Sequence, residues 1–340
     1  MGDERLLAEA RRYYTVGLQL AKESSSQPSL RPAFNTACGL LACDLYESFR
    51  SDGNIQDIID GHTKAVCNII RASESPRSFD ELVPFQLQHF RFKALLRSLV
   101  CRRPVVDEHI WAVCSRSPLT PIAETLIQLA MHVTVVLSSA TPSDSSNPSH
   151  QGMADRVLHR LLDLETEFGR WLTRFRDSFH GTSPEQMQMG LPPNLYQLWS
   201  DEQFPMQSDN SASGSVLSLS CLSIYYMCML LIRERLLDFA TGLPSALAHR
   251  DLFTEATECA ECLCKIIRNE TTSSRSPVAR ALLLRAIFPF VLHWFGRIRD
   301  GAKLEWCLRN EAQIRESVLF MKWDRVQWFG FNAMSWLEHC

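Results

Sequence analysis

The stretch VLSLSCLSIYYMCMLLIRERLLDFA, residues 216–240, decides the fold class of this protein. Its apolar residues run well beyond the usual length of a β-strand, so the stretch predicts a long helix that packs inside a protein core. The polar segment QSDNSASGS, residues 207–215, comes directly before it and predicts a loop.

The same helical pattern continues outward from this stretch in both directions. Apolar residues return every three or four positions, and we find no convincing period-two strand pattern and no tandem repeat. Pro84 is suited to the first position of one such helix. Further helices are predicted over residues 5–22, 34–50, 55–73, 84–100, 118–137, 153–179, 252–270, 276–296 and 305–330.

These patterns predict an all-α fold, a multi-helix array of roughly eight to eleven helices. The chain has 340 residues, of which 46% are hydrophobic and 21% charged, so a large core is expected. A serine-rich and proline-rich segment, SSATPSDSSNPSHQG (138–152), predicts a second flexible loop. We read it and the 207–215 loop as insertions in a single domain covering residues 1–340, where protease should cut first.

The charge balance argues against a nucleic-acid surface. The formal net charge is −3, whereas domains that grip phosphates normally carry a strong basic excess. A locally positive region spans residues 91–103. We interpret it as a helix face with its C-terminal cap, and a contact with phosphate or an acidic partner is the alternative. Its cationic residues are Arg91, Lys93, Arg97, Arg102 and Arg103.

Membrane insertion and secretion are not expected. The N-terminal segment MGDERLLAEARRYY lacks the apolar core of a secretory signal, and the apolar run at residues 126–137 is too short and interrupted for a bilayer. An intracellular, reducing location follows, and the 12 cysteines are then mostly small buried residues rather than disulfides.

The segment ECAECLCKII (258–267) places Cys259, Cys262 and Cys264 within six positions. Structural zinc needs four thiolate or imidazole ligands, and the chain has no second C-x-x-C. A redox pair of the thioredoxin type would need a preceding strand. We therefore interpret these cysteines as buried helix residues, with a metal site and a redox site as the alternatives, and expect the purified protein to carry no stoichiometric zinc.

No catalytic, cofactor-binding or metal-binding residue is predicted. The chain has no P-loop, no G-x-G-x-x-G and no G-x-S-x-G. His62 and Cys67 lie close together in the sequence, but no third group is available to orient the histidine.

Two carboxylate pairs have a spacing that could hold magnesium on a helix, namely Asp57 with Asp60 and Asp163 with Glu167. Basic residues near the second pair favour a solvated, charge-paired helix face instead.

Five of the eight tryptophans fall after residue 290. Most are expected in the core, and a ligand pocket near these C-terminal aromatic residues is the alternative. They are Trp294, Trp306, Trp323, Trp328 and Trp336.

The segment LLACDLYESFRSDGNIQDIIDGHTKAVCNIIRAS (40–73) resembles the opening block of the fungal-specific transcription factor domain, with Tyr46, Glu47 and His62 where that block places such residues. Later blocks follow in the family's order, and the resemblance covers most of residues 5–330. These blocks are FRFKALLRSLVCRRP, LLDLETEFGRWLTRF, LSLSCLSIYYMCMLLIRERLLDF and SPVARALLLRAIFPFVLHWFG.

Full-length members of that family carry an N-terminal six-cysteine zinc cluster and a basic segment that place a helix on DNA. This chain opens directly into the first regulatory-type helix and shows neither. The resemblance thus implies a regulatory protein without direct specific DNA binding, acting through protein partners such as a transcription factor or co-regulator, or through a small-molecule effector.

The resemblance also implies a place in the nucleus, or alternatively the cytoplasm, and control of a metabolic gene cluster, plausibly for secondary metabolites. Two other hypotheses stay open at this point. The first is an enzyme on the same helical fold that acts on a small biosynthetic intermediate. The second is a truncated version of a full zinc-cluster transcription factor.

Overall fold

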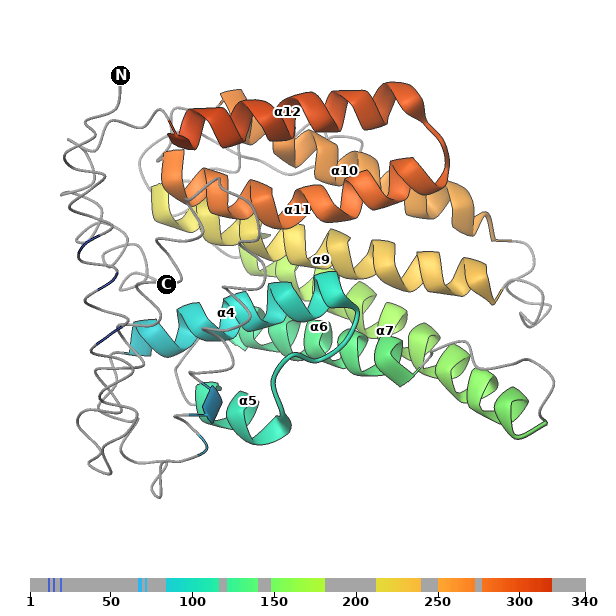
Figure 1. Cartoon of the computed structure of the whole chain (residues 1–340). Coiled ribbons are helices and arrows are strands. Elements are labelled where there is room, and N and C mark those ends of the chain that lie inside the picture. The colour runs from blue at the N-terminus through green and yellow to red at the C-terminus, as the bar shows by residue number, and fades with distance from the viewer. Residues whose placement is uncertain are drawn as a thin grey trace. The chain divides into compact units, whose positions relative to one another are not determined.

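The computed structural model describes residues 84–115, 121–139, 148–180, 212–239, 250–272 and 277–319. It also describes six isolated positions, namely Arg12, Thr15, Gln19, Cys67, Asn68 and Arg71. This part of the chain contains eight helices and no strand, which confirms the predicted all-α class (Figure 1).

Seven of these helices lie where the sequence pattern predicts them. They and the one additional helix are α4 (Pro84–Cys101), α5 (Glu108–Cys114), α6 (Pro121–Ser139), α7 (Pro148–His180), α9 (Ala212–Asp238), α10 (Leu252–Thr272), α11 (Pro277–Arg297) and α12 (Gly301–Leu319).

Three details differ from the sequence prediction. The short helix α5 was not predicted, because it has only 7 residues and shows too little periodicity. Both predicted loops are partly helical: α6 extends to Ser139, α7 begins at Pro148 and α9 begins at Ala212. Serine, alanine and an initial proline are compatible with a helix end, so polar composition alone overestimated the loops.

The chain divides into two compact units. Unit 1 comprises Met1–Ala94, Val106–Pro118 and Gln313–His339, and unit 2 comprises Leu95–Val105, Leu119–Ala312 and Cys340. Most of the described helices belong to unit 2. The single-domain interpretation stays a prediction.

Helix α9 is the centre of unit 2. It packs against α6, α7, α10 and α11, and Figure 1 shows it between α6 and α7 on one side and α10 and α11 on the other. Residues on all of its sides are consequently buried, which explains why its sequence is apolar throughout rather than amphipathic. Among them are Leu222, Met227, Cys228, Ile232 and Leu236, each at most 1% exposed.

Trp171 of α7 contacts two neighbouring helices, α6 and α9. Trp171 stacks on Phe175, with ring centroids 4.9 Å apart, and on Tyr225 of α9, with centroids 5.8 Å apart. The indole Nε1 of Trp171 also donates a hydrogen bond of 2.8 Å to the carbonyl of Ile122 in α6. A buried tryptophan thereby keeps its polar atom paired.

Two of the turns in unit 2 contain arginine in the left-handed conformation that glycine usually adopts. Arg299 has φ of 57°, and its N–H bonds the carbonyl of Gly296 while Asp300 N–H bonds that of Phe295. This pair of bonds is a Schellman ending for α11. Asp300 then caps α12, since its Oδ1 accepts from Lys303 N–H at 3.1 Å. The cap explains why α12 begins at Gly301 rather than at residue 305.

In unit 1, α5 begins at an aspartate cap. Asp107 Oδ1 accepts from Ile110 N–H at 2.9 Å, and Oδ2 accepts from Arg71 Nη2 at 2.7 Å. Arg91 of α4 is buried, and its guanidinium lies 4.7 Å from the ring centroid of Trp111. The guanidinium is therefore stabilised by an aromatic face inside this unit.

Helix α6 is long and apolar enough to cross a membrane by length and composition alone, and half of that stretch is buried inside the protein. Its buried residues, such as Leu126 and Val133, lie in the helix that packs against α7 and α9. The argument that residues 126–137 are too short for a bilayer underestimated this helix, which has 19 residues. Such partial burial against other helices is typical of a helix in a protein core.

Candidate functional site

A pocket of about 120 Å³ lies in unit 2, where the C-terminal end of α4 meets α9 and α11. Most of its wall is apolar, and its polar residues are Arg102, Glu234 and His293. Ligand sites in proteins usually combine an apolar wall with a few polar groups in this way. The apolar residues are Leu99, Val100, Leu230, Leu231, Pro289 and Phe290.

The carboxylate of Glu234 connects the three elements around the pocket. Arg102 Nη2 donates to Oε2 at 2.8 Å, and Arg297 Nη1 donates to Oε1 at 2.9 Å. His293 Nε2 lies 2.7 Å from the same Oε1. The Glu234 side chain is only 3% exposed, whereas its three partners are between 37% and 51% exposed. A buried acceptor is thus held by donors that reach in from the surface.

These partners keep Glu234 charged. Burial raises the pKa of the carboxyl, but the hydrogen bond with His293 and the positive charge of Arg102 outweigh burial and lower the pKa to about 2. The carboxylate is therefore ionised at any physiological pH.

Three charged residues that do not line the pocket, Arg235, Asp238 and Arg297, extend the network of Glu234. Arg297 Nη2 also donates to Asp238 Oδ1 at 2.7 Å, and Arg235 Nη1 donates to Asp238 Oδ2 at 3.1 Å. The cluster of Arg102, Glu234, Arg235, Asp238 and Arg297 therefore contains three guanidiniums and two carboxylates.

The backbone that carries Arg102 is strained. Arg102 has φ of 54°, its N–H bonds the carbonyl of Leu99, and Arg103 N–H bonds that of Ser98. These bonds form a Schellman ending, where glycine is usual and a residue with a side chain costs about 1–2 kcal/mol. A strained residue whose side chain reaches a buried charge is the kind of outlier that marks functional sites.

The spacing of residues on α9 and α11 places the other groups of this site on one face of each helix. Leu230, Glu234 and Asp238 follow one another at four-residue intervals on α9, and Pro289, His293 and Arg297 do the same on α11. Pro289 has no N–H, so α11 lacks one backbone hydrogen bond beside the pocket.

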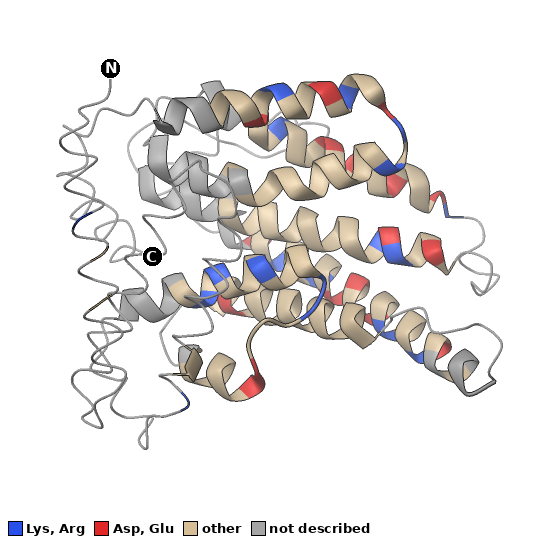
Figure 2. Cartoon of the chain, viewed as in Figure 1, with Lys and Arg blue, Asp and Glu red and all other residues tan. Residues whose placement is uncertain are grey.

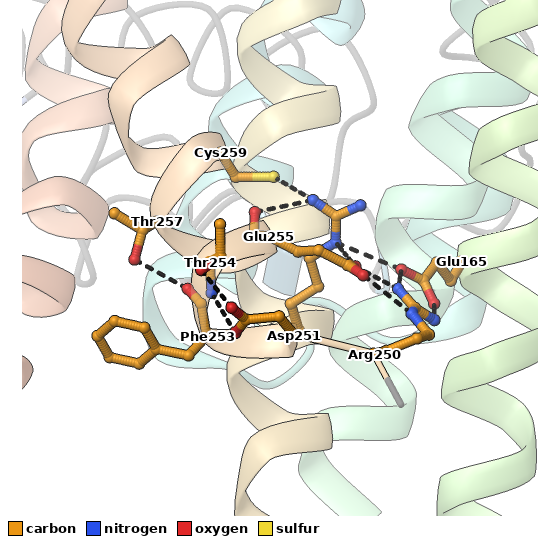
Figure 3. Close-up of polar contacts among 9 residues, drawn as sticks. Glu165, Arg250, Asp251, Phe253, Thr254, Glu255, Thr257 and Cys259 are labelled. Carbon is orange, nitrogen blue, oxygen red and sulfur yellow. Dashed lines mark hydrogen bonds and ion pairs between the residues drawn. The ribbon is translucent and has the colours of Figure 1, made fainter. Parts of the chain in front are cut away.

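A second polar cluster links α7, α9 and the start of α10 (Figure 3). Arg250 binds both oxygens of Glu165, at 2.7 and 2.8 Å, and its Nε donates to Glu255 at 3.0 Å. Arg233 donates to the backbone carbonyl of Glu255 at 2.9 Å and to the sulfur of Cys259 at 3.0 Å. Burial raises the pKa of Glu165, and the bonds and charges of the two arginines outweigh burial and lower it.

This second cluster is a structural connection rather than a binding site. Two guanidiniums meet two carboxylates, so the charges balance and the groups are directed at one another. The pocket at Glu234 has an apolar wall that carries three polar residues, and is therefore the candidate functional site.

The three cysteines of the ECAECLC segment lie on α10 in different surroundings. Cys259 is buried beside Arg233, and burial raises the pKa of its thiol to about 12. Cys262 and Cys264 are half-buried, and Cys264 faces Cys307 of α12 with the two sulfurs 4.0 Å apart. Among the residues that the structure describes, no cluster of three histidine, cysteine or acidic side chains could hold a metal ion.

The carboxylate pair on α7 lies on a solvated face. Asp163 is exposed, and Glu167 pairs with Arg170 one turn further along. Glu165, between them, instead points inward to the second cluster, which the sequence reasoning did not predict.

The basic region at residues 91–103 is not one continuous surface. Arg91 is buried over Trp111 and Arg102 is bound to Glu234, whereas Arg103 is exposed. Arg91 is therefore a buried residue rather than part of a basic helix face, whereas Arg102 and Arg103 lie in the turn that ends α4, as the interpretation as a C-terminal cap predicted.

Two of the C-terminal tryptophans, Trp294 and Trp306, lie in the described part of the chain, and neither lines the pocket. Trp294 is 1% exposed and belongs to the core, and Trp306 is half-buried. The pocket adjoins the same helix as Trp294 but is lined there by Pro289, Phe290 and His293.

Several residues singled out from the sequence lie outside the described part. They are Tyr46, Glu47, Asp57, Asp60, His62, Trp323, Trp328 and Trp336.

The residues that sequence reasoning missed carry a recognisable signal. Glu234 stands in the apolar run LLIRERLLDF, and His293 stands in the apolar run PFVLHWFG. A charged or polar residue inside a buried helix needs a partner, so such interruptions point to a buried polar cluster.

Comparison with known families, curated proteins and solved structures finds no match to this chain. The resemblance to the fungal-specific transcription factor domain, and with it the nuclear location and the partners that it implies, stays a prediction.

Proposed function

We propose that this protein is a regulatory protein that binds a small effector in the pocket at Glu234 and acts through protein partners. The observation that carries the proposal is an apolar pocket whose polar residues, Arg102, Glu234 and His293, come from three different elements. The regulatory role, plausibly over a metabolic gene cluster, rests on the sequence resemblance.

The chemistry of the pocket favours a small organic anion. An apolar cavity of roughly 150 Å³ holds a benzene-sized molecule, so a volume of about 120 Å³ suits a single ring or a short chain. The guanidinium of Arg102 on the pocket wall favours a negative group on the ligand. Arg102 can receive it, because its one hydrogen bond to Glu234 uses one of five N–H donors.

Ligand binding in the pocket can change the affinity of the protein for a partner, because the pocket is formed by several helices. The ligand touches the end of α4, α9 and α11 together, so it stabilises the arrangement in which these elements form the pocket. A partner that binds the same arrangement then binds more tightly when the effector is present.

The ligand class is tested with benzoate, with benzyl alcohol as the uncharged counterpart. Ligand-observed NMR on the purified protein is expected to detect benzoate, and Arg102→Gln is expected to weaken it at least about tenfold, as loss of a charged hydrogen bond does. Arg309→Gln removes an exposed arginine on α12 and serves as the control. Equal binding of both probes, or no effect of Arg102→Gln, contradicts an anion site.

An enzyme is the second candidate, and the His293–Glu234 pair favours it. A carboxylate 2.7 Å from an imidazole can orient that imidazole, and an oriented imidazole is the commonest general base. In this role Glu234 would hold the ring while the half-exposed His293 faces the substrate.

Gene deletion with paired transcript and metabolite profiling separates the two candidates. A regulator predicts that transcripts of several genes fall together. An enzyme predicts normal transcripts and one accumulated intermediate, and predicts that a folded His293→Gln variant fails to restore the product.

A further inference from the structure

Two free cysteines meet between α10 and α12 in unit 2, away from the pocket residues. The sulfur of Cys264 lies 4.0 Å from the sulfur of Cys307, although the two residues are 43 positions apart in the chain. Cys264 belongs to the ECAECLC segment, and its partner lies in the segment EWCLRN of a different helix.

Contacts on both sides of the thiols hold the two helices in this register. One turn before Cys264, Glu261 Oε1 accepts from Lys303 Nζ at 2.6 Å. One turn after it, the guanidinium of Arg268 lies 5.7 Å from the ring centroid of Trp306. The two sulfurs are therefore kept facing each other by neighbours of different chemistry.

We propose that Cys264 and Cys307 form a redox-sensitive dithiol that a hydroperoxide converts to a disulfide. A disulfide has a sulfur–sulfur bond of about 2.05 Å, so the two sulfurs must approach by about 2 Å. Rotation of the two side chains, with a small shift of α12, supplies such a movement.

The arrangement of the two thiols favours the reaction. The hydrogen bond from Cys264 lowers the pKa of Cys307 against the opposing effect of burial, and the same bond raises the pKa of Cys264. With Cys264 as the donor of this bond, Cys307 gives up its proton more readily than Cys264 does. Cys307 is buried and Cys264 is half-buried, so a hydroperoxide has to pass Cys264 to reach the sulfur of Cys307.

The chemistry proceeds in two steps. The Cys307 thiolate attacks one oxygen of the hydroperoxide, the O–O bond breaks, and the leaving oxygen takes up the proton that Cys307 released. The sulfur of Cys264 then attacks the sulfenic sulfur, the S–O bond breaks and water leaves with the Cys264 proton. The two sulfurs are oxidised by two electrons in total, and hydrogen peroxide is reduced to two waters.

The disulfide would restrain the helix that contributes His293 to the pocket. The segment between Cys264 and Cys307 contains the whole of α11, so the new bond closes a covalent loop of which this helix is a part. A closed loop has less conformational freedom in the unfolded state, and the oxidised protein should therefore be harder to unfold.

The test uses the full-length, fully reduced protein and hydrogen peroxide. The expected result is loss of two of the 12 thiols and a fall in mass of about 2 Da, both reversed by dithiothreitol. Tryptic digestion without reductant should join the peptide that ends at Lys265 to the peptide LEWCLR, residues 304–309. Thermal unfolding should shift upward by roughly 5 °C.

Three alanine variants identify the sulfurs involved. Cys264→Ala and Cys307→Ala should each keep all of their 11 remaining thiols after peroxide treatment, whereas Cys262→Ala, a half-buried neighbour on the same helix, should still lose two. Far-UV circular dichroism establishes that each variant is folded. A disulfide within the ECAECLC segment, a link between two molecules, or over-oxidation of single cysteines without a link would overturn the proposal.

Discussion

Glu234 shows most directly how a single residue depends on its surroundings. It lies near the C-terminal end of α9 and is 2% exposed, and an unpaired carboxylate buried there would cost several kcal/mol. Arg102, His293 and Arg297 remove that cost by binding both of its oxygens. The residue is thus tolerated only in the assembled fold.

Replacing Glu234 by glutamine is expected to lower the free energy of unfolding at pH 7 by about 1–3 kcal/mol. The folded pKa of about 2 is below the ordinary value of 4.5, so the charge stabilises the fold above pH 4.5. That contribution is lost as the pH falls from 4.5 toward 2. Urea unfolding at several pH values should therefore show a difference between the two proteins at pH 7 that disappears near pH 2. The exposed change Glu305→Gln is the control, and a difference that is constant with pH contradicts the argument.

The two left-handed arginines allow the cost of backbone strain to be separated from the value of a side-chain contact. Arg299→Gly should stabilise the protein by about 0.5–1 kcal/mol, because glycine accepts the positive φ without strain. Arg102→Gly relieves the same strain but removes the bond to Glu234, and should yield no gain or a loss. Thermal unfolding of both variants measures the contrast. An equal gain in both would mean that the Arg102 bond contributes nothing to stability.

At the scale of elements, largely buried ion pairs connect helices of unit 2. Glu165 of α7 accepts from Arg250, which precedes α10, and from Arg233 of α9. Three elements are therefore connected at one carboxylate. Asp163, two residues earlier on the same helix, faces solvent and takes no part in this connection.

Glu165→Ala is expected to lower the free energy of unfolding by about 3 kcal/mol, since it leaves two largely buried guanidiniums with Glu255 alone. Asp163→Ala should change it by no more than about 0.5 kcal/mol, as exposed substitutions usually do. Urea unfolding of the two variants provides the measurement. Similar losses of stability in the two variants would show that Glu165 contributes no more to the free energy of unfolding than the exposed Asp163.

At the scale of the whole molecule, positive and negative charges are mixed. The formal net charge is −3, and Figure 2 shows blue and red segments interspersed along the described helices. Affinity for DNA without base contacts depends on the number of cationic contacts with phosphates.

The pure chain is accordingly expected to bind duplex DNA weakly and without sequence preference. A mobility-shift assay at physiological salt, with two unrelated duplexes of equal length, tests this. Tight binding to one duplex only would reveal a DNA-reading surface. A partner that itself holds DNA would not be needed in that event.

The sequence by itself determined the all-α class and the approximate position of seven helices. Helix α9 is recognisable because its apolar run exceeds any strand, and α7 because its apolar residues return every three or four positions. These are local properties, since a helix bonds residues only four apart and its periodicity is written in neighbouring positions. Local composition failed at helix ends, where Pro148 and Ala212 start helices inside predicted loops, and at the short helix α5.

Only the tertiary structure decided which residues form sites. Arg102 and Glu234 are 132 positions apart and Cys264 and Cys307 are 43 apart, so no local pattern joins them. Their meeting depends on how α9 packs among its neighbours and on the side-chain contacts between α10 and α12. A sequence states which side chains are available on each helix face. The packing of those faces brings a buried carboxylate to its arginines and one thiol to another.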